Sequence, residues 1–173
     1  MPKIIENIRE QLLIEAKKQV LQQGYSKTTM RSVAKGCSVG VGTLYNYFDS
    51  KEMLVATFVL EDWNDYLKMM GNLYFKDAKT YLQGIYMLLC DFEEKYKSLF
   101  SDKEAAKSIG TVFYSRHRQL RKQIAGFVGN ICKGDNSLFT AEFIAENLLC
   151  WSMEKIDFEM IYLLLDKIIK EEN

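Results

Sequence analysis

A segment centred on residue 45 carries polar groups at a spacing that suits hydrogen bonding to anions and to polar ring edges. Leu44 and Phe48 stand four residues apart, so a helix over residues 41–48 would bury both on one face. The remaining faces of that helix would then expose Thr43, Tyr45, Asn46 and Tyr47. Hydroxyl and amide side chains, together with lysines such as Lys51, are groups that bind phosphates and base edges. The segment therefore predicts a short helix with a polar binding surface.

Catalytic and metal-binding chemistry has little support elsewhere in the chain. His117 is the only histidine, and no triad or metal-ligand partners lie near it in the sequence. The four cysteines are Cys37, Cys90, Cys132 and Cys150, and no two of them form a CxxC pair. No glycine-rich phosphate loop is present. We therefore expect buried thiols, no metal, no cofactor and no enzyme activity.

The polar segment follows a second helix and a sharp turn. Thr28 or Thr29 can cap a helix whose apolar positions are Met30, Val33, Ala34 and Cys37. Three glycines between Gly36 and Gly42 supply the backbone freedom that a reversal needs. An earlier helix over residues 4–23 should end at Gly24. The three helices predict a helix-turn-helix module, whose last helix enters the major groove of DNA.

Composition is that of a helical protein without a global charge signature. The chain has 173 residues, 48% of them hydrophobic, one proline and a formal net charge of zero. Residues 1–52 hold eight Lys and Arg against five Asp and Glu, so the N-terminal end is mildly basic. The chain has no signal-peptide core and no apolar run long enough for a membrane. These features predict a soluble, cytoplasmic protein.

The remainder of the chain also shows helical periodicity. Further helices are expected over residues 50–70, 78–97, 101–109, 111–132, 140–152 and 157–170, with Ser50, Ser101 and Thr140 as caps. The expected fold class is all-α, with about nine helices. We place a DNA-binding domain at residues 1–49 and a helical effector-binding and dimerisation domain at residues 50–173.

The stretch GYSKTTMRSVAKGCSVGVGTLYNYFDSKEML resembles the TetR/AcrR family of bacterial transcriptional regulators. The match runs in register through GTLYNYFDSKEML and covers, with the first helix, about a third of the chain. Two departures fall in the turn, where CSVG replaces the usual Ala-Gly-Val-Ser. Ser38 then takes a position that often needs positive φ, and Gly40 replaces the usual cap. Ser32 replaces a residue that is often acidic.

The resemblance implies which residues touch DNA. The positions that match are Thr28, Thr29, Arg31, Gly40, Val41, Gly42, Thr43, Tyr45, Asn46, Tyr47 and Lys51. The threonines and Lys51 would bind phosphates, Arg31 would read a guanine edge, and the glycines would allow close approach. The alternative is that the two tyrosines only pack and that Lys51 is an ordinary surface lysine.

The resemblance also implies a ligand cavity and a dimer. Residues expected near a small apolar or aromatic effector are Trp63, Tyr66, Tyr86, Cys90, Phe113, Tyr114, His117 and Trp151. Aromatic residues at helical spacing can equally form plain core. Residues 158–169 are apolar on almost every side, which a monomer could hardly bury, so residues 140–170 are expected to form a homodimer.

The expected function is a homodimeric repressor that binds a palindromic double-stranded DNA operator and is released by a small effector. One alternative is a regulator of the same fold that a protein partner controls, or that activates transcription without a small ligand. Another is a helical enzyme or ligand carrier that retains the module as a scaffold.

Overall fold

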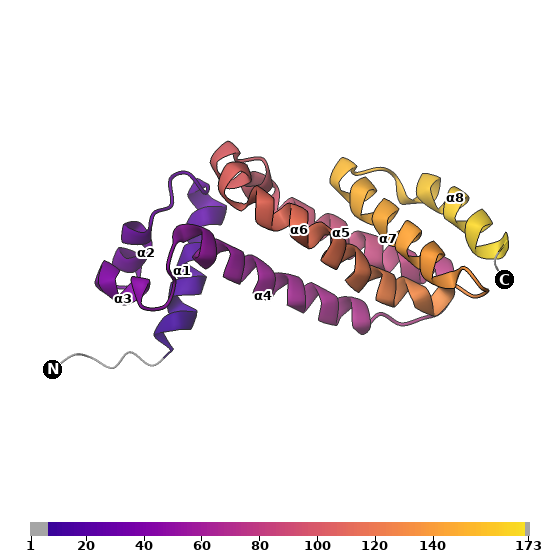
Figure 1. Cartoon of the computed structure of the whole chain (residues 1–173), viewed down its shortest axis with the longest axis horizontal. Helices are drawn as coiled ribbons and strands as arrows, with labels where there is room; N and C mark the ends of the chain where they lie inside the picture. The colour runs from indigo at the N-terminus through magenta and orange to yellow at the C-terminus, as the bar shows by residue number, and fades with distance from the viewer. Residues whose placement is uncertain (1–6, 172–173) are drawn as a thin grey trace. The chain divides into compact units, whose positions relative to one another are not determined.

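The all-α fold predicted from the sequence is confirmed. The computed structural model describes residues 7–171, apart from the side chains of residues 109–116 and 170–171. Within that range the elements are α1 (Ile8–Gln23), α2 (Met30–Gly36), α3 (Val41–Tyr45), α4 (Lys51–Gly71), α5 (Ala78–Phe100), α6 (Lys103–Val128), the 3-10 helix η1 (Gly129–Ile131), α7 (Ser137–Glu154) and α8 (Phe158–Glu171) (Figure 1). The described residues contain no strand. No helix among them combines the length and apolar character needed to cross a bilayer.

The chain divides into two compact units by its internal contacts. The first comprises residues 1–63 and 95–111, and the second comprises residues 64–94 and 112–173. The helices α4, α5 and α6 each contribute residues to both units. The two units are defined by packing and not by function. The functional boundary expected between residues 49 and 50 therefore stays a prediction.

The first unit contains the expected three-helix module. α1 packs on α2, and α2 packs on α3. Its core includes the fully buried Leu12, Val20, Val33 and Leu44. Gly24 ends α1 with φ 90°, and its N–H donates to the Val20 carbonyl at 3.0 Å. A positive φ of this size suits glycine, so the predicted end of the first helix is confirmed.

A charged side chain anchors α1, α4 and α5 within the first unit. Asp62 on α4 accepts from Lys17 Nζ at 2.6 Å and from the Tyr96 hydroxyl at 2.7 Å, and Lys95 Nζ lies 2.5 Å away. Burial alone would raise the pKa of Asp62, but the hydrogen bonds from these three partners outweigh burial and lower it. Because its partners come from two other helices, Asp62 fixes how those helices meet.

The second unit has an apolar interior and a hydrogen-bonded corner. Ile85, Ile124, Ile144 and Leu165 are fully buried, and they come from α5, α6, α7 and α8. The Tyr86 hydroxyl lies 2.9 Å from the Trp151 carbonyl and 2.6 Å from the Ile156 carbonyl, between α7 and α8. This tyrosine therefore satisfies backbone acceptors where the chain turns, and α7 and α8 lie side by side (Figure 1).

Several predicted helix boundaries and caps were wrong. The helices expected at 101–109 and 111–132 are one helix, α6, because a single glycine at 110 costs only about 1 kcal/mol inside a helix. Asp102, not Ser101, caps α6 and accepts from the N–H groups of Glu104 and Ala105 at 2.9 and 3.1 Å. α7 begins at Ser137, so Thr140 is a buried helical residue and not a cap. The cap at Ser50 is confirmed, since its hydroxyl accepts from Met53 N at 3.2 Å.

Candidate nucleic-acid interface

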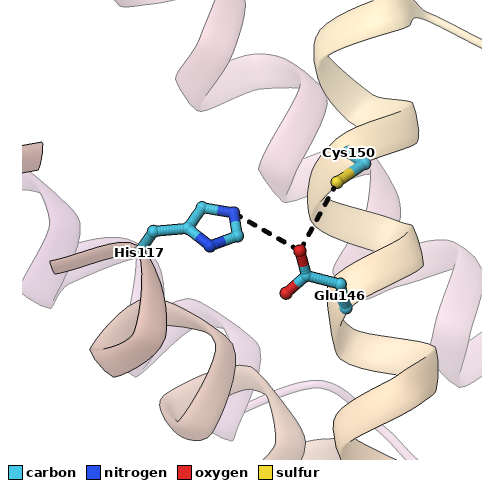
Figure 2. Close-up of side chains that lie close together, drawn as sticks. All are labelled: His117, Glu146 and Cys150. Carbon is cyan, nitrogen blue, oxygen red and sulfur yellow. Dashed lines mark hydrogen bonds and ion pairs between the residues drawn. The ribbon is translucent and has the colours of Figure 1, made fainter. Parts of the chain in front are cut away.

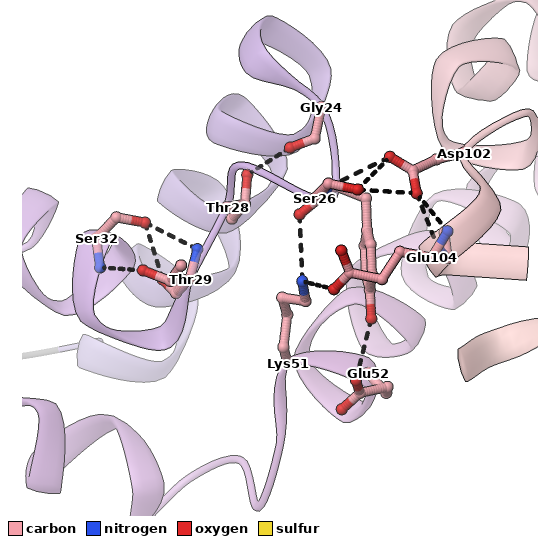
Figure 3. A network of polar contacts seen from close by, with 11 residues as sticks. Gly24, Ser26, Thr28, Thr29, Ser32, Lys51, Glu52, Asp102 and Glu104 are labelled. Atoms are coloured by element: carbon pink, nitrogen blue, oxygen red, sulfur yellow. Dashed lines mark hydrogen bonds and ion pairs between the residues drawn. The ribbon is translucent and has the colours of Figure 1, made fainter. Parts of the chain in front are cut away.

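α2 is held at its start by a reciprocal pair of hydrogen bonds. The Thr29 hydroxyl accepts from Ser32 N at 3.0 Å, and the Ser32 hydroxyl accepts from Thr29 N at 3.0 Å (Figure 3). Ser32 thus completes a capping box that is usually closed by an acidic residue or glutamine. The departure seen at residue 32 therefore keeps a capping box at the start of α2.

The two predicted phosphate-binding threonines have different surroundings. Thr28 is 1% exposed, and its hydroxyl donates to the Gly24 carbonyl at 2.9 Å. Thr29 is exposed at the start of α2, and so is Arg31 two residues later. The structure therefore gives Thr28 a role in closing the α1–α2 connection, and it leaves Thr29 and Arg31 on the surface.

The turn between α2 and α3 adopts the geometry expected from its sequence. Ser38 has φ 56°, which confirms the predicted positive φ, and the Val39 N–H donates to the Ala34 carbonyl at 3.0 Å. Gly40 precedes α3 in an extended conformation and provides no side-chain cap. The first turn of α3 therefore keeps backbone N–H groups that no Gly40 side chain covers.

α3 buries its apolar residues and exposes its polar ones. Leu44 is fully buried and Phe48 is 5% exposed, as predicted. Tyr45 and Tyr47 are 49% and 46% exposed, and the other exposed positions of this segment are Gly40, Gly42, Thr43 and Asn46, with Val41 partly exposed. The helix ends at Tyr45 rather than at Phe48, because residues 46–47 form a turn in which Tyr47 N and Phe48 N both donate to the Leu44 carbonyl. The polar groups thus surround a short helix and the turn that follows it.

Lys51 is engaged by protein groups. Its ammonium lies 2.9 Å from Glu104 Oε1, donates to the Tyr25 carbonyl at 3.3 Å and sits 3.8 Å from the centre of the Tyr25 ring. Its side chain is 16% exposed. The ion pair with Lys51 lowers the pKa of Glu104. A phosphate would have to compete with Glu104 for this ammonium.

Two acidic residues at the start of α6 complete this network, and sequence reasoning did not assign them to it. Asp102 accepts from the Ser26 hydroxyl at 2.9 Å, next to the pair formed by Lys51 and Glu104 (Figure 3). The N–H of Ala105 and the hydroxyl of Ser26 hold the pKa of Asp102 below its usual value. The only signal in the sequence was an acidic helix start, which could not name partners so far away.

Three of the eight residues predicted to surround an effector are packed within the protein. Trp63, Tyr66 and Tyr86 are 4–5% exposed, and the Tyr66 hydroxyl donates to Asp91. Cys90, His117 and Trp151 are partly exposed, while the side chains of Phe113 and Tyr114 lie outside the described residues. A surface groove of about 490 Å³ in the second unit is instead lined by Lys122, Ala125, Gly126, Gly129, Ser137, Leu138, Ala141 and Glu142. The effector site stays a prediction.

Comparison with known proteins identifies the N-terminal segment. Residues 12–57 match the family model described as bacterial regulatory proteins, tetR family. The transcriptional regulator UidR of Escherichia coli K12 is 33% identical over 54 residues, which are 31% of this chain and 28% of UidR. The regulator HbdR of Aromatoleum is 37% identical over 51 residues, 30% of this chain and 22% of HbdR. The chain thus spans under a third of the length of these curated relatives.

Solved structures share the fold over most of the chain. Salmonella enterica GusR superposes with a TM-score of 0.69 over 98% of this chain and 100% of that one, at 17% identity. A TetR-family regulator from Pectobacterium atrosepticum gives a TM-score of 0.67 over 84% of this chain and 79% of its own, also at 17% identity. The segment at residues 12–57 therefore matches the tetR family of bacterial regulatory proteins, and the chain shares its helical fold with solved structures that include a TetR-family regulator.

Proposed function

We propose that this protein is a transcriptional repressor that reads a palindromic operator with α3. The observation that carries the proposal is the division of α3 into a buried apolar side at Leu44 and an exposed polar side at Tyr45 and Tyr47. A helix of this kind can enter the major groove, while the exposed Thr29 and Arg31 at the start of α2 reach the adjacent backbone and base edges. The glycines at 40 and 42 add no bulk between α3 and the DNA.

The protein acts as a homodimer through α7 and α8. Phe158, Ile161, Leu165 and Ile169 bury one side of α8 inside the second unit. Large apolar side chains on these two helices remain exposed: Leu138, Phe139, Phe143, Met153, Met160, Leu163 and Leu164. Apolar surface of this kind favours a second copy, since a four-helix contact between copies would bury it. Two copies would present two α3 helices to half-sites ~34–36 Å apart.

An effector releases the operator by changing the contacts that α6 makes at the DNA-binding module. Glu104 and Asp102, at the start of α6, hold Lys51 and Ser26 within the first unit. A ligand that binds one arrangement of α6 more tightly would shift this network and the availability of Lys51. The burial of Trp63, Tyr66 and Tyr86 favours the second candidate, control by a protein partner, because these side chains already fill core positions.

Gel-shift titration of a duplex selected by the wild-type chain from a random pool tests the DNA role. Tyr45→Ala should weaken specific binding by roughly tenfold or more, since a contact in the groove is typically worth ~1–3 kcal/mol. Lys51→Ala should weaken binding to all sequences and lower the slope of affinity against salt by about 1. Tyr74→Ala is the matched control, because Tyr74 is 84% exposed on the connection between α4 and α5. Unchanged affinity in the Tyr45 and Lys51 variants would refute this assignment.

A further inference from the structure

Three potential metal ligands that are far apart in the sequence lie together in the second unit. His117 comes from α6, and Glu146 and Cys150 come from α7, one helical turn apart (Figure 2). His117 Nε2 lies 3.8 Å from Glu146 Oε1, and Cys150 Sγ lies 3.7 Å from the same oxygen. The three ligand atoms are all within 4.8 Å of one another. The two helices therefore bring an imidazole, a carboxylate and a thiol together in one small volume.

The distances between these three atoms are close to those between the ligand atoms around a tetrahedrally coordinated ion. Zinc binds imidazole nitrogen and carboxylate oxygen at ~2.0–2.2 Å and thiolate sulfur at ~2.3 Å, which separates neighbouring ligand atoms by roughly 3.3–3.7 Å. The two shorter separations in the structure already approach this range. Small rotations of the Cys150 and His117 side chains would shorten the third separation, between the His117 nitrogen and the Cys150 sulfur. The nitrogen, oxygen and sulfur donor set suits zinc and similar borderline ions rather than magnesium or calcium.

A neighbouring arginine orients the carboxylate. Arg121 on α6 lies 3.5 Å from Glu146 Oε2 and 3.5 Å from Glu142 Oε2. Glu146 thus gives one oxygen to Arg121 and turns the other toward His117 and Cys150. Partners that hold a ligating carboxylate in this way tune metal sites, and their loss typically lowers affinity by ~10–100-fold. Arg121 also balances part of the negative charge that Glu142 and Glu146 bring to the site.

We propose that His117, Glu146 and Cys150 bind one zinc-class divalent ion, with a fourth position left for water or another ligand. On binding, the Cys150 thiol loses its proton to solvent and its sulfur bonds the metal in place of donating to Glu146. The ion joins α6 to α7, the two helices that supply the ligands. This site is independent of the DNA contacts proposed above, and it adds an inorganic ligand to a unit for which an organic effector was expected.

Cobalt titration of the full-length, tag-free chain tests the site, after treatment with a chelator and under a non-chelating reductant. One equivalent of Co²⁺ should give the near-ultraviolet band of a thiolate-to-cobalt bond and the visible bands of tetrahedral cobalt, and Zn²⁺ should abolish both. Cys150→Ser should remove the thiolate band. His117→Gln should weaken cobalt binding by roughly tenfold or more. Because His117 is the only histidine in the chain, no other imidazole can replace it.

Cys37→Ser is the matched control, since Cys37 is a partly exposed thiol in the first unit. It should leave the cobalt spectrum unchanged, and far-ultraviolet circular dichroism should show every variant folded. The proposal is overturned if folded wild-type protein gives no thiolate band at one equivalent of Co²⁺. It is equally overturned if the band survives Cys150→Ser, if His117→Gln binds as tightly as wild type, or if Cys37→Ser removes the band. None of these readouts involves DNA, so they do not depend on the operator-binding proposal.

Discussion

Helix α3 of the first unit and helices α7 and α8 of the second unit expose opposite kinds of surface. At α3 the first unit exposes hydroxyl and amide groups around a buried Leu44, whereas α7 and α8 of the second unit expose leucine, methionine and phenylalanine side chains. Exposed polar groups are satisfied by water until a polar partner replaces it, but exposed apolar surface is costly until another apolar surface covers it. The difference between these surfaces is the basis for the two proposed partners, DNA for the first unit and a second copy for the second.

Their interiors differ as well. The first unit uses Asp62, with two lysines and a tyrosine, to join three helices. The second unit is closed mainly by aliphatic residues such as Ile85, Ile124 and Leu165. Stability of the first unit should therefore depend on pH through a named carboxylate, in addition to its apolar core.

The largest expected effect comes from placing a charge on the apolar surface of α8. Leu163→Asp should convert the proposed dimer to a monomer in sedimentation velocity, because Leu163 is 68% exposed and an aspartate buried at the proposed contact would lack a partner. Operator affinity should fall by roughly 100-fold or more, since linked binding to two half-sites is lost. Helicity should stay unchanged.

Met87→Asp is the matched control for that variant. Met87 is 65% exposed on α5, outside the two helices proposed to form the dimer. A Leu163→Asp protein that remains dimeric, or a Met87→Asp protein that dissociates equally, would remove the basis for assigning the apolar surface to a second copy.

A smaller effect is expected at the charged anchor of the first unit. Asp62→Asn should lower the free energy of unfolding by about 1.5–3 kcal/mol near neutral pH, because it weakens hydrogen bonds to charged groups. The folded pKa of Asp62 is lowered, so its contribution is complete above the unfolded pKa of ~3.9 and is lost as pH falls through the folded value. Urea unfolding at several pH values should show wild type and variant converging in acid.

Asp65→Asn gives the comparison on the same helix. Asp65 is 61% exposed and pairs with Lys68 at 2.7 Å, so its loss should cost less than about 0.5 kcal/mol. If the difference in unfolding free energy between wild type and Asp62→Asn stays constant in acid, the Asp62 charge does not anchor these helices.

The smallest effect should come from the turn before α3. Ser38 has φ 56°, a conformation that costs a residue with a Cβ about 1–2 kcal/mol and glycine almost nothing. Part of this gain in stability is offset because glycine has a greater conformational entropy than serine in the unfolded chain. Ser38→Gly should therefore stabilise the protein by about 0.5 kcal/mol in thermal unfolding, and Ser38→Ala should give no such gain. Equal stability of the two variants would argue against strain at this turn.

Local patterns in the sequence predicted the first unit well and the contacts between distant segments poorly. The spacing of Leu44 and Phe48 correctly predicted that both are buried. The glycine-rich turn correctly predicted the positive φ at Ser38. The continuity of α6 through residue 110 was missed, because packing along a long helix can override one glycine. The pair of Lys51 with Glu104 joins segments that no sequence spacing relates.

The convergence of His117 with Glu146 was missed for the same reason, since helical periodicity says which side of a helix is buried and not which helix lies opposite. The eight residues expected around an effector were chosen by residue type, within the helices that enclose such a cavity in similar proteins. That criterion does not distinguish a cavity wall from a filled core, and Trp63, Tyr66 and Tyr86 proved to be nearly fully buried.

Hydroxyl-radical footprinting of the selected duplex tests the central claim most directly, because it reports where each copy of α3 touches one piece of DNA. Wild-type protein should protect two segments centred about one helical turn, ~10 base pairs, apart, and Tyr45→Ala should lose both together. A single protected segment, or two that persist unchanged in Tyr45→Ala, would contradict the claim that paired α3 helices read the operator.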